Sequence, residues 1–211
     1  MVSKGSMLVG QDSKIPLSRV DALLQHEVGT HVLTYYNGKA QPLRQLYSGL
    51  AGYEALQEGL AVLAEYLVGG LSRPRLRLLA ARVLAARLMI DGATFVDCFR
   101  KLNRESGLAQ HTAYTVTMRV FRAGGLSKDA IYLRGLNQLL EYLNDGGSLK
   151  PLFVGKIAAD HVPVIEELMW RRVLCEAPLT PRYMDRPETG ERLERVRRYE
   201  SVLDLVEEEY K

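Results

Sequence analysis

The chain has 211 residues, 47% of them hydrophobic and 25% charged, which is the composition of a globular protein that can bury a core without disulfides. Lys and Arg exceed Asp and Glu by 28 − 25 = +3, a surplus too small to indicate a nucleic-acid-binding protein. Two cysteines exclude a disulfide framework, and charges interrupt each long apolar stretch, so we expect a cytoplasmic protein without a membrane span.

Hydrophobic spacing predicts a mostly α fold with at most one or two strands at the start. Residues 1–16 are interpreted as a leader whose apolar run at 7–9 suits one strand. Residues 17–183 are expected to form one helical domain, and 184–211 a charge-rich tail, either a solvated helix or a mobile segment. The predicted helices cover residues 19–36, 54–68, 75–90, 93–104, 110–122, 127–143 and 161–175.

The segment Gln25-His26-Glu27-Val28-Gly29-Thr30-His31 carries the most informative pattern. Its two histidines are five residues apart, which on an ideal α-helix separates them by about 140°, too far for one metal ion. A π-type turn holds about 4.4 residues and reduces that angle to roughly 50°. Gly29 lies where such a distortion is easiest. We therefore predict a local π turn that brings His26 and His31 to one ion, with Glu27 beside its water.

Catalytic zinc needs a third protein ligand and an open position. Glu58, in Gln57-Glu58-Gly59-Leu60-Ala61, is the candidate, because it lies among apolar residues on a predicted helix and a buried carboxylate needs a partner. Each feature has an ordinary alternative. Histidines at this spacing also occur by chance, and a lone glutamate is more often a surface or ion-paired residue.

These motifs carry a family resemblance. The segments HEVGTH, LYSGLAGYEALQEGLAVLAEYL, TVTMRVFRAGGLSKDAIYLRGL and PLFVGKIAADHVPVIEEL resemble the bacterial QEGLA-motif proteins, known as flavohemoglobin expression-modulating. That group is similar to the eukaryotic microtubule-associated tyrosine carboxypeptidases. The resemblance runs from about residue 9 to residue 183.

The resemblance implies a zincin-like zinc metallopeptidase that hydrolyses a C-terminal peptide bond or a related amide. It implies His26, His31 and Glu58 as Zn²⁺ ligands and Glu27 as the catalytic acid/base. Family members are about twice this length, so the chain corresponds to the C-terminal half and is expected to lack the usual substrate-aligning sheet. A missing N-terminal segment or a partner chain is the expectation that follows, and with it the alternative of an inactive fragment.

The remaining parts of such a site are assigned by residue type. Tyr114 is the predicted oxyanion donor, with Tyr53 as the alternative. Arg119 and Arg122 are the predicted cations for the substrate carboxylate, which an arginine fork binds well; ion pairing within the protein is the alternative role. Lys156 is interpreted as a surface residue, with a position in the cleft as its alternative.

Three functions compete at this point. The first is a metallocarboxypeptidase-like enzyme that acts on a peptide or protein C-terminus. The second is a non-catalytic interaction or regulatory protein that retains a structural zinc site. The third is a basic helical nucleic-acid binder, which the dispersed arginines between residues 73 and 87 disfavour. The expected partners therefore include neither nucleic acid nor membrane.

Overall fold

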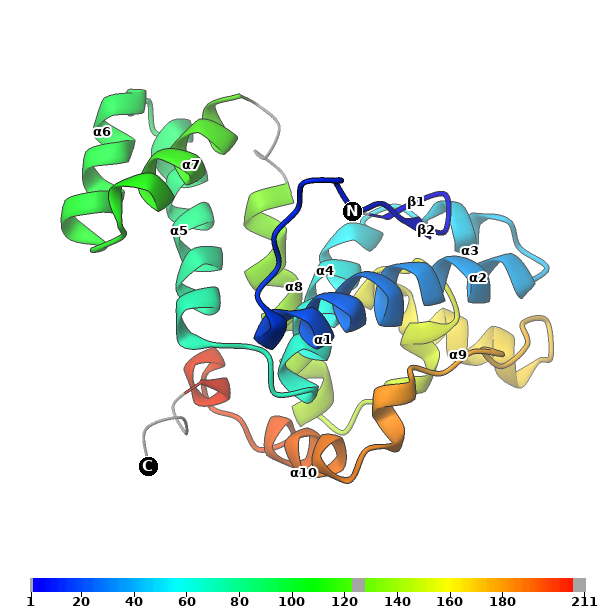
Figure 1. Ribbon diagram of the computed structural model, residues 1–211. Helices are drawn as coiled ribbons and strands as arrows, with labels where there is room; N and C mark the ends of the chain where they lie inside the picture. The colour runs from blue at the N-terminus through cyan, green and yellow to red at the C-terminus, as the bar shows by residue number, and fades with distance from the viewer. Residues whose placement is uncertain (1, 123–127, 207–211) are drawn as a thin grey trace. The chain divides into compact units, whose positions relative to one another are not determined.

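The computed structural model describes residues 2–122 and 128–206 (Figure 1). The chain forms two compact units, one from Met1–Leu71 with Gly135–Lys211 and the other from Ser72–Arg134. Helices make up most of the described ranges, and strand occurs there only near the N-terminus, which confirms the mostly α class. Within the same ranges, no helix combines the length and the apolar character that crossing a membrane requires. The boundaries predicted at residues 16 and 183 stay a prediction.

The first unit begins with a β-hairpin. Strands β1 (Val2–Ser3) and β2 (Ser6–Met7) pair antiparallel, with Val2 opposite Met7. The two residues between them, Lys4 and Gly5, have φ angles of 48° and 79°, as a type I′ hairpin turn requires. The strand expected at residues 7–9 is thus shorter and earlier, because pairing across this turn ends at Met7. Both strands pack against the helical segment at Glu27–Val32.

One continuous helical rod carries the histidine motif (Figure 1). It consists of α1 (Leu17–His26), a π-helical segment η1 (Glu27–Val32) and α2 (Leu33–Ala40). The rod runs past the end predicted at residue 36, because Asn37 and Gly38 keep helical backbone angles instead of the left-handed ones that end a helix. The Asn37 side chain donates hydrogen bonds to the backbone oxygens of Phe153 and Leu179.

Helix α4 (Tyr53–Leu67) is the centre of the first unit and follows a short helix, α3 (Gln45–Ser48). Its residues from 55 to 67 are buried except Glu58, which is half-buried. Helix α1 and the π-helical segment η1 both pack on α4. The apolar run that follows the glutamate motif therefore places Glu58 next to the histidine rod.

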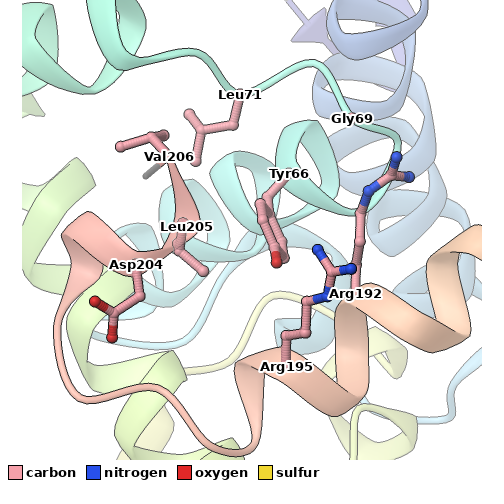
Figure 2. A pocket seen from close by; sticks show the side chains of 8 residues that line it. All are labelled: Tyr66, Gly69, Leu71, Arg192, Arg195, Asp204, Leu205 and Val206. Atoms are coloured by element: carbon pink, nitrogen blue, oxygen red, sulfur yellow. The ribbon is translucent and has the colours of Figure 1, made fainter. Parts of the chain in front are cut away.

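Helix α10 (Pro187–Val196) packs against α4. Thr189 and Arg192 of α10 donate hydrogen bonds to the Leu67 oxygen at the end of α4. Figure 2 shows the pocket beside this contact, where Arg192 and Tyr66 lie among the residues that line it. The described elements of the first unit that follow α8 (Lys128–Asn144) in the chain are η3 (Lys150–Phe153), η4 (Ala159–His161), α9 (Val162–Trp170), η5 (Arg182–Asp185), α10 (Pro187–Val196) and η6 (Val202–Leu205).

The second unit has an alanine-rich core of its own. It contains α5 (Arg73–Ile90), α6 (Phe95–Arg100), the π-helical segment η2 (Lys101–Glu105) and α7 (Gln110–Phe121), followed by the start of α8 (Lys128–Asn144). Small side chains on α5 allow α7 to approach closely. The buried residues of this core are Ala81, Ala85, Ala86, Cys98, Leu102, Leu108, Ala113, Val116 and Val120.

A glycine contact in the first unit provides a test of the packing around α4. A Cβ atom on Gly59 would lie 2.3 Å from the carbonyl carbon of Gly135 in α8, so the two backbones touch. We expect Gly59→Ala to lower the free energy of unfolding by about 1–3 kcal/mol, measured by urea denaturation. The control is Gly190→Ala in α10, where nothing lies within 4 Å. That variant should gain about 0.5–1 kcal/mol; equal stability of the two variants would contradict the close helix contact.

Candidate metal centre

The π turn predicted from the histidine spacing is present. His26 is the last residue of α1, and His31 lies in the π-helical segment from Glu27 to Val32. The wider turn brings the two imidazole rings together, with their centroids 5.3 Å apart and their planes at 81°. Gly29 lies inside this turn and is buried, and a Cβ atom there would lie 3.4 Å from the ring of Tyr183.

Glu58 completes the group of three that the sequence predicted. Its Oε2 atom lies 3.7 Å from His26 Nε2 and 3.6 Å from His31 Nε2. One ligand atom from each of the three residues lies within 4.8 Å of the other two. His26 is buried and the other two residues are half-buried, so the group is recessed but accessible. The helix rod and α4 thus direct two nitrogens and one oxygen to one point.

The donor set fits a zinc ion. Tetrahedral zinc with bonds of about 2.0–2.1 Å holds neighbouring ligand atoms roughly 3.3 Å apart, a few tenths of an ångström closer than Glu58 Oε2 lies to either imidazole nitrogen. Two histidines and one glutamate are also a ligand set of catalytic zinc sites that keep one position open. A zinc ion at this point would accept one lone pair from each histidine nitrogen and one from the Glu58 carboxylate oxygen.

A buried carboxylate orients the first histidine. Glu65 is 1% exposed, and its Oε1 atom accepts a hydrogen bond of 2.9 Å from His26 Nδ1. This bond fixes the tautomer and leaves the Nε2 lone pair facing Glu58, an arrangement that a cation between the two groups stabilises. The other oxygen of Glu65 accepts a hydrogen bond of 2.7 Å from Arg19 Nη2, which balances the buried charge.

Neither Glu65 nor Arg19 was predicted from the sequence as a neighbour of the three converging residues. A signal was available, because Glu65 follows Glu58 by seven residues, or about two helical turns, and therefore shares its face of α4. The role of Arg19 depends on how α1 crosses α4, which no local pattern reveals.

The comparison with known proteins agrees with this geometry. The family model described as microtubule-associated tyrosine carboxypeptidase matches residues 1–201. The chain belongs to this family. No curated protein matches the chain. The match extends the region of resemblance beyond residues 9–183, and it supports a carboxypeptidase-like activity for this member of the tyrosine carboxypeptidase family.

In this member of the tyrosine carboxypeptidase family, Glu27 is next in the chain to the metal group, which consists of His26, His31 and Glu58. It directly follows His26, begins the π-helical segment and is half-buried. Tyr53, at the start of α4, is also half-buried, and its pKa is raised by burial and then by the charges of Glu54 and Glu58. A phenol keeps its proton at neutral pH in any case, so Tyr53 can act as a hydrogen-bond donor.

The other three predicted site residues belong to the second unit. Tyr114 is 51% exposed, and its ring packs edge-on against Phe95. The Nε atom of Arg119 donates to both oxygens of the fully buried Asp129, at 2.7 and 3.0 Å. Arg122 is exposed at the end of α7. The role of Tyr114 as oxyanion donor and those of the two arginines as substrate ligands stay predictions.

Removal of the Glu65 charge tests the hydrogen-bond network behind the metal group. We expect Glu65→Gln to weaken zinc binding about 10- to 100-fold, because the amide polarises the His26 ring less than the carboxylate does. Competition with a chromophoric chelator measures the zinc dissociation constant.

The control variant is Asp21→Asn, which removes an exposed carboxylate on α1 that pairs with Arg186 at 2.6 Å. This exposed pair should affect neither zinc binding nor stability by more than a few tenths of a kcal/mol. Equal zinc affinity in both variants would show that Glu65 does not act on the metal group.

Proposed function

We propose that this chain is a zinc-dependent metallocarboxypeptidase-like hydrolase that releases the C-terminal residue of a peptide or protein. The convergence of His26, His31 and Glu58 immediately beside Glu27 is the observation that carries the proposal. Family membership supports the reaction class, and the donor set supports zinc as the metal. The zincin-like description of the fold and the cytoplasmic location belong to the same proposal.

The chain supplies the groups that hydrolysis of an amide bond requires. A bound zinc ion would contribute Lewis-acid catalysis at the position that the three ligands leave open. Glu27 accepts a proton from the attacking water as its oxygen bonds to the scissile carbonyl carbon. The same carboxyl group then returns the proton to the nitrogen as the carbon–nitrogen bond breaks, so that an amine leaves and a new carboxylate forms.

Tyr53 is suited to stabilise the negative charge on the carbonyl oxygen. It belongs to the same unit as the metal group, and Glu58 is close enough to act on its pKa. A phenol is protonated throughout the neutral pH range and can donate a hydrogen bond, and burial raises the pKa of Tyr53 further. Tyr114 was the first choice from the sequence and stays the alternative donor.

The family name indicates tyrosine as the residue to test first at the substrate C-terminus. A peptide set that varies only in its last residue, tyrosine included, decides the preference of this chain. Release of the free amino acid, detected by mass spectrometry, is the direct measure of activity.

Glu27→Gln is the decisive variant. We expect a loss of turnover of about 10²- to 10⁴-fold, because an amide cannot accept the proton of the attacking water. Zinc content should stay at one ion per chain, since Glu27 is not among the three converging residues. The control is Glu105→Gln, at a side chain that is 68% exposed and pairs with Lys101, for which turnover should not change.

The other outcomes separate the competing functions. Zinc bound by the wild-type chain without release of any amino acid would favour the interaction protein with a structural zinc site. Absence of zinc from both the wild-type chain and His26→Ala would remove the metal site, and with it the hydrolase.

A further inference from the structure

Lys156 has an environment that its interpretation as a surface residue did not anticipate. The residue is half-buried, and burial lowers the pKa of its ammonium group. Its Nζ atom lies 5.5 Å from the ring centroid of Tyr35 and 5.6 Å from that of Tyr53. Among the described residues, no carboxylate forms an ion pair with this group. The structure thus holds a partly desolvated cation between two aromatic rings.

The backbone fixes Lys156 beside the segment that leads into α4. Its amide donates a hydrogen bond of 2.7 Å to the Leu46 oxygen, and its oxygen accepts one of 3.0 Å from the Leu50 amide. Gly155 allows this approach, because a Cβ atom there would lie 2.6 Å from the Leu46 oxygen. Backbone hydrogen bonds to both its amide and its carbonyl group therefore fix the position of Lys156.

The two tyrosines connect Lys156 to the metal group. Tyr35 follows His31 by four residues, about one turn further along the same face of the rod. Tyr53 begins α4, the helix that carries Glu58, and its pKa is raised by burial first and then by the charges of Glu54 and Glu58. Lys156 thus lies over one ring from the histidine rod and one from α4, the two elements that supply the three converging residues.

The energetics of this position favour an anionic ligand. Tyrosine rings offset part of the desolvation of an ammonium group through cation–π contacts. A carboxylate offers more, because a charge-assisted hydrogen bond in a partly buried site is stronger than a contact with a neutral ring. A free substrate C-terminus would provide the counter-charge that no described side chain provides.

We propose that Lys156 binds the terminal carboxylate of the substrate and so restricts the site to free C-termini. The inference rests on the proposed carboxypeptidase function and names the residue that distinguishes it from an internal peptidase. Lys156 takes the role first assigned to Arg119, whose Nε atom already binds Asp129.

The test compares two versions of one peptide ending in tyrosine, with a free C-terminal carboxylate or with a C-terminal amide. Binding to zinc-loaded Glu27→Gln protein is measured by calorimetry, so that the result does not depend on turnover. We expect the carboxylate form to bind about 10- to 100-fold more tightly than the amide. Adding Lys156→Met should abolish this difference, and Lys156→Arg should restore part of it.

Lys39→Met is the matched control. Lys39 also lies over the Tyr35 ring, at 5.1 Å, but it is exposed and its other ring neighbour is Tyr47. In the Glu27→Gln background this variant should keep the full preference for the carboxylate form. In active protein, Lys156→Met should raise KM for the free peptide about 10- to 100-fold with a smaller change in kcat.

The two proposals fail separately. A preference for the carboxylate form that survives Lys156→Met in folded, zinc-loaded protein overturns the role of Lys156, even if the wild-type chain cleaves peptides. Absence of cleavage by the wild-type chain overturns the proposed function, while the binding comparison still decides the role of Lys156. If Lys156→Met does not fold, Lys156→Gln replaces it, and a preference retained in that variant has the same meaning.

Discussion

The five-residue spacing of the two histidines, one residue longer than in the familiar zinc-binding helix, is the constraint on which the candidate metal centre depends. Five positions on an α-helix would direct His26 and His31 to different sides of the rod, whereas the π-helical turn from Glu27 to Val32 directs both toward α4. The distortion is confined to this segment, because regular α-helix precedes and follows it. A local change in helical pitch thus brings both imidazoles to one side of the rod, as the four-residue spacing does in the zinc helices of metalloproteases.

A distorted turn needs support from its surroundings, and the first unit provides it on two sides. The hairpin β1–β2 packs on the π-helical segment, and Gly29 is close to the buried ring of Tyr183. On the side facing α4, the chain of hydrogen bonds from Arg19 through Glu65 to His26 fixes the imidazole. The donor geometry therefore follows from packing and a buried ion pair, and zinc binding would select an arrangement that is already formed.

Two charged groups outside the three converging residues differ in whether an opposite charge pairs with them. Asp129 in the second unit is fully buried, and Arg119 donates a hydrogen bond to it, so the two charges neutralise each other. Lys156 in the first unit has tyrosine rings around it and no carboxylate among the described residues. Residue type alone favoured the arginines, because an arginine fork binds a carboxylate well. The ion pair of Arg119 and the position of Lys156, which only the structure reveals, favour the lysine for this role.

The sequence by itself determined the mostly α class, the π turn and the three converging residues, because helical periodicity and residue spacing are local properties of the chain. The approximate extents of most helices follow from the same patterns. Only the tertiary structure decided the support of His26 by Glu65 and Arg19 and the position of Lys156 between two tyrosines. These contacts join residues as many as 121 positions apart, as between Tyr35 and Lys156, and they depend on which helix faces cross. No spacing rule within one segment encodes such a crossing.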